Sequence, residues 1–266
     1  MKTDIVIVGT GVSGLYCALN LPRDKKIVMV TKADDDKSDS FLAQGGICVL
    51  KDENDYDSYF EDTMRAGHYE NNKESVDIMI RSSRDVINDL VGYGVRFEKE
   101  NGEFAYTKEG AHSTSRILFH EDITGKEITS HLLTAVKELD NVTIIENFTM
   151  VDIIEENNEC FGIIGYGKDG KYIDIQADFT VFAYKARDPV LDQFKIFKGL
   201  GHTDHHAIEP HRMNGHSSTG RNKRIITGNC DRNTNAVSAA HYNGYRWLTQ
   251  TADSFGNGQP RFYITA

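Results

Sequence analysis

The chain has 266 residues, a formal net charge of −10 and 39% hydrophobic residues. This length allows one large domain or two small ones, and the acidic balance argues against nucleic acid as a partner. No apolar run approaches the roughly 20 residues of a membrane span. The first strand starts too early to leave room for a signal peptide, so none is expected. The four cysteines are scattered without a C-x-x-C pair, which predicts a reduced, cytoplasmic protein.

A glycine-rich turn stands near the start of the chain. The β-branched run Ile5–Val8 predicts a strand buried on both faces, and the apolar spacing after residue 12 predicts a helix. The G-x-G-x-x-G spacing between them matches a dinucleotide-binding turn in its required context. In such a turn Gly9 permits the tight bend, Gly11 lets a pyrophosphate approach, and Gly14 lets helix and strand pack closely.

The end of the second predicted strand, residues 27–31, distinguishes between nucleotides. An NAD site places an acidic residue there to hold the ribose, but this chain has Thr31 and Lys32. The acids Asp34, Asp35 and Asp36 come later and are interpreted as a solvated loop. The sequence therefore favours FAD over NAD.

Two further segments have unusual composition. Gly45 and Gly46 interrupt the apolar stretch 40–47, which indicates either close approach of the backbone to a flat group or a simple bulge. Residues 107–120 concentrate polar groups in an irregular segment. Glu109, His112 and Arg116 are candidate site residues there, and the alternatives are a surface salt bridge, a core hydrogen bond and a structural ion pair, respectively.

The remaining pattern up to residue 183 alternates helices and strands. Amphipathic helices are predicted over 57–66, 74–91 and 124–139, with a hairpin around Asn101-Gly102 and a strand over 142–146. Three β-segments, 149–156, 160–167 and 171–176, form a predicted meander before a buried strand at 179–183. The fold class is therefore α/β, a Rossmann-like doubly wound domain with a β-meander, over residues 1–183.

Composition changes after residue 183. Residues 1–183 contain 19 Lys and Arg against 34 Asp and Glu, whereas residues 184–266 contain 11 against 6. This tail has no sustained helical or strand period, and we interpret it as poorly ordered and as the product of a slipped reading frame or a degraded gene model. Its histidines are accompanied by a single cysteine and no acid at a tight ligand spacing, so no metal site is expected.

Four blocks within residues 4–183 resemble the L-aspartate oxidases of the fumarate reductase/succinate dehydrogenase flavoprotein superfamily. The blocks are G-T-G-V-S-G at 9–14, A-Q-G-G at 43–46, E-G-A-H-S-x-x-R-I-L-F-H at 109–120 and T-G-K-E-I at 124–128. Ala111 departs from the glycine of the family pattern. After Ala183 the family continues T-G-G, but this chain has Tyr184-Lys185-Ala186.

The resemblance assigns roles to individual residues. It implies that Thr10, Gly11, Val12 and Ser13 contact the FAD pyrophosphate, that Lys32 lies by the adenosine ribose, and that Val151 lies by the adenine. The residues expected to line the flavin ring are Ser40, Ala43, Gln44, Gly45 and Gly46. Those expected to face the active site are Glu109, His112 and Arg116, with Glu109 as the substrate-side acid.

The activity implied by the resemblance is oxidation of L-aspartate to iminoaspartate, with oxygen or fumarate as the final acceptor. The product would feed quinolinate and NAD synthesis, and quinolinate synthase is an implied partner. Two alternatives stay open. One is a fumarate reductase or succinate dehydrogenase flavoprotein, and the other is a non-catalytic remnant that binds FAD weakly or only its ADP half.

Overall fold

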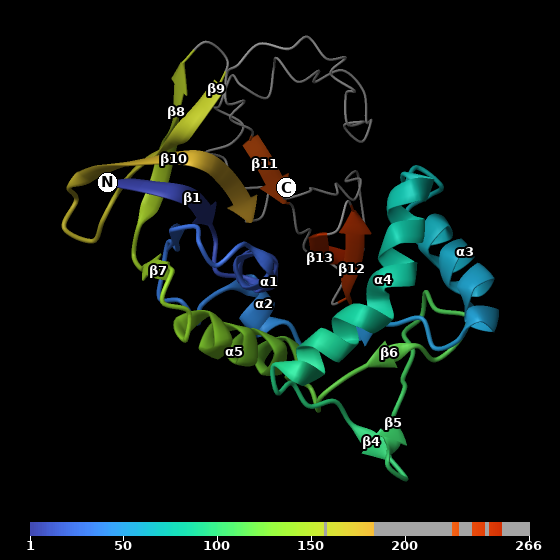
Figure 1. Ribbon diagram of the computed structural model, residues 1–266. Coiled ribbons are helices and arrows are strands. Elements are labelled where there is room, and N and C mark those ends of the chain that lie inside the picture. The colour runs from blue at the N-terminus through green and yellow to red at the C-terminus, as the bar shows by residue number, and fades with distance from the viewer. Residues whose placement is uncertain (157–158, 184–224, 229–235, 243–244, 252–266) are drawn as a thin grey trace.

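The computed structural model describes residues 1–156 and 159–183, followed by three separate strands at 225–228, 236–242 and 245–251. Its central feature is a sheet with a parallel half in the order β7-β2-β1-β10 (Figure 1). These strands are β1 (Lys2–Val8), β2 (Ile27–Val30), β7 (Val142–Ile145) and β10 (Tyr172–Ala183). All four residues of β2 are buried, as expected for a strand covered on both faces.

The meander continues the same sheet in antiparallel fashion. It consists of β8 (Thr149–Glu156), β9 (Glu159–Tyr166) and the first half of β10. The sequence analysis separated 171–176 from 179–183, and this division was wrong. Burial alternates without interruption through Ile175 and Ala177, so one twelve-residue strand pairs first with β9 and then with β1.

Two hydrophobic clusters lie on opposite faces of the sheet. Ile5 and Ile7 of β1 contribute to the cluster formed with the helices α1 (Val12–Asn20), α4 (Lys73–Gly92) and α5 (Thr124–Lys137). Val6 and Val28 contribute to the cluster formed with β8, β9 and β10. Helices thus cover one face of the parallel half of the sheet. The other face of the parallel half packs against side chains of the meander, whereas a doubly wound sheet has helices on both faces.

Shorter elements link these layers. They are α2 (Asp39–Leu42), β3 (Ile47–Cys48), η1 (Glu53–Asp55), α3 (Tyr56–Ala66), β4 (Lys99–Glu100), β5 (Glu103–Phe104) and β6 (Ile117–Leu118). The predicted helices at 57–66, 74–91 and 124–139 are confirmed by α3, α4 and α5. The hairpin is confirmed by β4 and β5, because Asn101 and Gly102 between them both have positive φ. The single turn of α2 was not predicted.

Three strands belong to the segment after residue 183. Strand β11 (Ile225–Gly228) pairs in parallel with β10, while β12 (Ala236–Tyr242) and β13 (Tyr245–Thr251) form an antiparallel pair. The sequence analysis assigned no strand here, and the rest of the tail prediction lies outside the described residues. Among the helices of the described part, none combines the length and apolar character needed to cross a bilayer.

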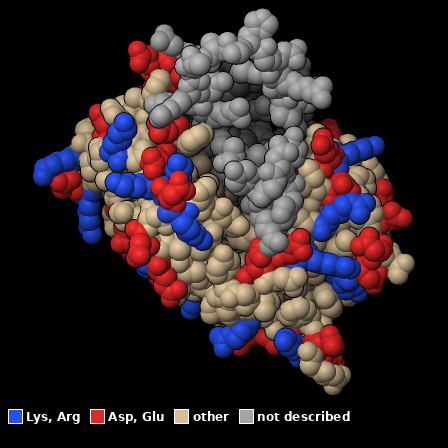
Figure 2. All heavy atoms as spheres, viewed as in Figure 1, with Lys and Arg blue, Asp and Glu red and all other residues tan. Residues whose placement is uncertain are grey.

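Charged side chains of both signs are mixed on the surface. On the face shown in Figure 2, Lys and Arg alternate with Asp and Glu, and uncharged surface separates the groups. This view is the same as that of Figure 1, so the mixture extends over both the sheet and the helical layer.

Candidate functional site

The glycine-rich turn lies where the strand order reverses. The chain proceeds from β1 to β2 on one side, and β10 occupies the other side of β1. The turn begins at Gly9, whose φ of 114° is a conformation that side chains rarely adopt, and the Gly9 amide donates to the carbonyl of Val30 at 2.8 Å. A reversal of this kind at the carboxyl ends of parallel strands is the usual place for a nucleotide.

Gly14 is enclosed by backbone. A Cβ atom on it would lie 2.1 Å from the Gly9 carbonyl oxygen and 3.3 Å from the Ala183 Cβ. The close packing predicted for this glycine is therefore confirmed, and its neighbours are the turn directly after β1 and the end of β10. Gly11 is less enclosed, since its Cβ would lie 3.1 Å from the Ser40 Oγ.

The start of α1 has the character of an anion site. Gly11 is its N-cap, without a side-chain hydrogen bond to the first turn, and none of the described first-turn residues is acidic. One amide, that of Val12, donates to the Ser40 Oγ at 3.2 Å. Because the amides at a helix start and the helix dipole both favour negative charge, this turn fits the pyrophosphate of a dinucleotide.

The segment proposed to line the flavin is held against α5 and β6. The Gly125 amide donates to the Ala43 carbonyl at 3.0 Å. A Cβ on Gly46 would lie 2.2 Å from Ile117 Cγ2, so the close approach inferred for this glycine is to strand β6. Gly45 is half-buried and Gln44 is exposed. Roles for Ser40, Ala43, Gln44, Gly45 and Gly46 in flavin binding remain predictions.

Lys32 and Val151 lie on adjoining segments. The Phe148 amide donates to the Thr31 carbonyl at 2.8 Å, and the Asn147 amide donates to the Ala33 carbonyl at 3.2 Å. The loop after β2 therefore runs beside the start of β8. Lys32 is exposed and Val151 is half-buried, and their placement by the ribose and the adenine remains a prediction.

The loop after β2 is less solvated than its three acids suggested. Asp35 is buried, and its Oδ2 pairs with Lys137 Nζ at 2.6 Å. Its amide donates to Glu146 Oε1 at 2.9 Å, and its carbonyl accepts from Thr10 Oγ1 at 3.3 Å. The solvated-loop interpretation is wrong for Asp35, because this residue connects α5, the end of β7 and the glycine-rich turn.

The three predicted active-site residues of the 109–116 loop have different surroundings. Glu109 is exposed, and its carbonyl accepts from the His112 amide at 3.0 Å. The half-buried His112 places its Nε2 3.2 Å from the Sγ of Cys48. Its Nδ1 is buried and has no hydrogen-bond partner among the described residues. His112 and Glu109 are thus near each other at one end of the loop.

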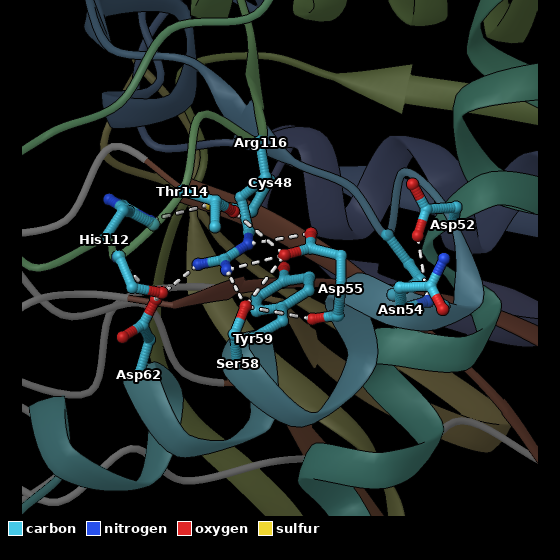
Figure 3. Close-up of polar contacts among 12 residues, drawn as sticks. Cys48, Asp52, Asn54, Asp55, Ser58, Tyr59, Asp62, His112, Thr114 and Arg116 are labelled. Atoms are coloured by element: carbon cyan, nitrogen blue, oxygen red, sulfur yellow. Dashed lines mark hydrogen bonds and ion pairs between the residues drawn. The ribbon is translucent and has the colours of Figure 1, made fainter.

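Arg116 has a different environment, shown in Figure 3. Its side chain is 0% exposed and lies between Asp55 and Asp62. Its Nη2 is 2.9 Å from Asp55 Oδ1, its Nη1 is 2.6 Å from Asp62 Oδ2, and its guanidinium lies 4.9 Å from the ring centre of Tyr59. The geometry favours the structural ion pair, the alternative raised from the sequence. Direct contact with a substrate remains an untested prediction for Arg116.

Sequence reasoning missed Asp55 and Asp62. Asp55 directly precedes α3, Asp62 lies in it, and both are buried. Their spacing in the sequence could have indicated a shared site. A spacing of seven residues is two helical turns and places two side chains on one face. Two buried acids on one face require a buried cation, and Arg116 supplies it.

Both carboxyl groups resist protonation. Burial alone would raise the pKa of Asp62, but hydrogen bonds from Ser113 and Arg116 outweigh it and lower the pKa from 3.8 to about 2. Burial is likewise outweighed at Asp55, where hydrogen bonds from Arg116, Ser58 and Thr114 lower the pKa. The cluster is therefore ionised across the physiological range.

We expect Asp62 to add to the free energy of unfolding by an amount that is lost in acid. Because its pKa is lower in the folded chain, the stabilisation is complete above pH 3.8 and is lost as the pH falls toward about 2. At neutral pH it amounts to about 2 kcal/mol. Urea unfolding between pH 7 and pH 2 measures it, and Asp62→Asn should flatten this part of the profile. An unchanged profile in that variant would contradict the assignment.

The described residues contain no cluster of three or more His, Cys, Asp or Glu that could hold a metal ion. Cys17, Cys48 and Cys160 are buried free thiols. The histidines of the tail, whose side chains lie outside the described residues, are not placed.

A comparison with protein families decides the class of the nucleotide site. The family described as FAD binding domain matches residues 4–237, which is most of the chain and extends beyond residue 183. The chain belongs to the FAD binding domain family. The expectation of FAD is thereby confirmed. That the glycine-rich turn with Gly9, Gly11 and Gly14 holds FAD remains a prediction.

Curated relatives of this FAD-binding chain are L-aspartate oxidases. The enzyme of Clostridium perfringens is 46% identical over 180 residues, which cover 68% of this chain and 41% of the relative. That of Clostridium acetobutylicum is 45% identical over 163 residues, covering 61% and 38%. The chain thus spans about two-fifths of the length of these relatives.

Solved structures confirm the α/β flavoprotein fold. The quinol fumarate reductase FrdA of E. coli has a TM-score of 0.66 at 20% identity, covering 71% of this chain and 35% of its own. The Sdh1 complex of Mycobacterium smegmatis has a TM-score of 0.62 at 24% identity, covering 68% and 33%. At these identities the likeness shows a shared fold.

Proposed function

We propose that this chain is the FAD-binding part of an L-aspartate oxidase, which converts L-aspartate to iminoaspartate. The observation that carries the proposal is the glycine-rich turn, in which Gly14 is enclosed by Gly9 and Ala183 and the start of α1 has no side-chain cap among the described residues. The 46% identity to the Clostridium perfringens L-aspartate oxidase supports the choice of substrate.

The nucleotide would be held along the carboxyl edge of the sheet. Thr10, Gly11, Val12 and Ser13 would hold the pyrophosphate, with Lys32 by the ribose and Val151 by the adenine. Ser40, Ala43, Gln44, Gly45 and Gly46 would line the flavin, which supplies a two-electron acceptor for a hydride. Ser40 already contacts the amide of Val12, which supports a continuous site from turn to flavin.

The loop 109–116 would face the substrate. Exposed Glu109 can accept a proton or orient the substrate amine, and His112 keeps an unpaired ring nitrogen within the described structure. Arg116 is proposed as a substrate contact on the resemblance alone, because its buried ion pairs favour a supporting role.

The physiological setting is also part of the proposal. The substrate is a small dicarboxylate, with oxygen or fumarate as the acceptor, and quinolinate synthase would use the product for NAD synthesis. A cytoplasmic location agrees with the three buried free cysteines. The division of the chain into a FAD-binding domain at 1–183 and a divergent tail at 184–266 remains a prediction based on the change in composition.

Two alternative functions are also supported by observations on this chain. Fold similarity to fumarate reductase and Sdh1 supports a flavoprotein of the fumarate reductase/succinate dehydrogenase type. The departure from the family pattern at Tyr184-Lys185-Ala186 supports a non-catalytic FAD-binding remnant. A covalent link between flavin and a histidine would favour the dehydrogenase class.

We expect FAD, and not NAD, to stabilise the chain. At a FAD concentration of 100 times Kd the gain is about 2.7 kcal/mol, measured by thermal shift and by flavin fluorescence. Gly11→Val should remove it, because the new side chain would meet Ser40 and occupy the path of the pyrophosphate. The matched control is Gly167→Ala, whose Cβ would meet Asp169 Oδ1 at an ordinary 3.5 Å.

Stabilisation by NAD alone would contradict the flavoprotein proposal. An aspartate-dependent peroxide assay on the FAD-loaded chain then separates the oxidase from the remnant. We expect no turnover from this chain by itself, and measurable turnover would exclude the remnant alternative.

A further inference from the structure

The loop that carries Glu109 and His112 lacks regular secondary structure of its own. Its base is closed by two hydrogen bonds between the backbones of Thr107 and Ile117, at 2.9 and 3.0 Å. Between these points the described chain is turn, bend or irregular. One backbone hydrogen bond inside the loop links the His112 amide to the Glu109 carbonyl, and the other contacts that orient this segment come from outside the loop.

Asp62 of α3 holds the middle of the loop. Its Oδ2 accepts from the Ser113 amide at 2.7 Å, from the Ser113 Oγ at 2.7 Å and from Arg116 Nη1 at 2.6 Å. One carboxylate oxygen thus joins two loop residues to the helix, and hydrogen bonds to a charged acceptor are stronger than neutral ones.

Asp55 holds the second half of the loop in the same way. Its Oδ1 accepts from the Thr114 Oγ1 at 2.9 Å and from Arg116 Nη2 at 2.9 Å, while its Oδ2 accepts from Arg116 Nε at 3.1 Å. Ser58 Oγ accepts from the same Arg116 Nη2 at 2.7 Å. These side chains converge on the guanidinium in Figure 3.

The charges of this cluster balance. Asp55 and Asp62 are 5% and 6% exposed and face the buried Arg116, and the second cation is Arg65, 2.6 Å from Asp62 Oδ1. Arg65 also donates to the carbonyl of Ala111 at 3.4 Å, between Glu109 and His112. Asp55, Asp62 and Arg65 therefore contact the loop at residues 111, 113, 114 and 116.

We propose that Asp55 and Asp62 are positioning residues, which hold the 109–116 loop so that Glu109 and His112 are presented to the dicarboxylate substrate. Neither carboxylate needs to touch the substrate, because each acts through Ser113, Thr114 or Arg116. The inference rests on the proposed function for its substrate. The attachment of the loop to α3 is independent of that function.

The test compares Asp62→Asn with Asp77→Asn in the full chain loaded with FAD. An asparagine at 62 keeps the size of the side chain but removes the charge that three donors share. The control removes an acid from α4 that pairs with Arg81 at 2.8 Å and with Tyr56, away from the loop. Ser113→Ala is a milder second variant, which deletes one hydrogen bond and leaves the buried ion pairs intact.

Four readouts distinguish positioning from general stability. We expect Asp62→Asn to raise the rates of amide exchange in the loop and of tryptic cleavage after the exposed Lys108 by roughly tenfold. Its FAD affinity should stay within about twofold of that of the unsubstituted chain. The L-aspartate concentration that half-saturates the change in flavin absorbance on binding, a signal that needs no turnover, should rise by a similar factor. Ser113→Ala should show a smaller change in the same direction, and Asp77→Asn should show neither effect.

Equal loop protection in Asp62→Asn, Ser113→Ala and Asp77→Asn would overturn the positioning role. Loop opening without any change in the half-saturating L-aspartate concentration would overturn it as well, since the loop would then be attached to α3 without affecting substrate binding. An unsubstituted chain that gives no L-aspartate signal would count against the proposed function, while the exchange and cleavage results still report on the attachment.

Discussion

Gly14→Ala is expected to destabilise the chain by about 3 kcal/mol, the upper part of the range for overpacking, and to abolish FAD binding. The added methyl group would lie 2.1 Å from the Gly9 carbonyl oxygen, and that oxygen belongs to backbone that cannot rotate away. Either α1 or the turn must move, and both movements displace the amides proposed to face the pyrophosphate. Urea unfolding and FAD titration measure the two effects.

Gly92→Ala is the matched control. Gly92 is the last residue of α4, and a Cβ there would meet nothing within 4 Å. Since alanine is the better helix former, this variant should be neutral or gain up to about 1 kcal/mol. If Gly14→Ala unfolded at the same urea concentration as the control, the enclosure of Gly14 by Gly9 and Ala183 would be refuted.

Arg116→Met is expected to cost about 3–5 kcal/mol, because it leaves buried Asp55 without a cation and leaves Asp62 paired only with Arg65, whose side chain is 54% exposed. Methionine keeps much of the side-chain volume and its contact with Tyr59, so the loss reports on charge. The control is Arg81→Met on α4, which breaks a pair between half-exposed side chains, Arg81 at 55% and Asp77 at 38%. Such exposed pairs contribute less than about 1 kcal/mol.

This comparison also separates the two interpretations of Arg116. A structural pair predicts a large loss of stability in urea unfolding. A direct substrate contact predicts unchanged unfolding and a selective loss of L-aspartate binding to the FAD-loaded chain. The second outcome would contradict the burial and the two ion pairs described here.

The nucleotide turn could be predicted from the sequence because its constraints are local. Gly9 requires a positive φ, and its spacing to Gly14 brings strand and helix together within six residues. The helices α3, α4 and α5 were predictable for a similar reason, since a periodic apolar face is recorded in consecutive residues. The FAD preference followed from Thr31 and Lys32, two neighbours at one strand end.

The contacts that could not be predicted join residues far apart in the chain. Asp35 pairs with Lys137, and Asp62 pairs with Arg116, so the sequence around each acid does not show which cation it meets. The continuity of β10 was missed because one half pairs with the meander and the other with β1, and the change of partner leaves no mark in the alternation of Ile175 and Ala177. Similarly, Gly46 was explained only by the distant strand β6.

The position of β1 between β2 and β10 has a consequence for biosynthesis. The amino group of Met1 donates to the carbonyl of Asp174, 173 residues later, and the β1–β10 register continues to Val8 and Phe182. At a synthesis rate of about 5–20 residues per second, β1 is made roughly 10 to 35 seconds before its partner β10. During this time one edge of β1 exposes unpaired backbone groups next to Ile5, Val6 and Ile7, a sequence that can pair with other chains. Ribosome-bound chaperones that cover an apolar N-terminal strand are therefore expected to raise the yield of folded protein.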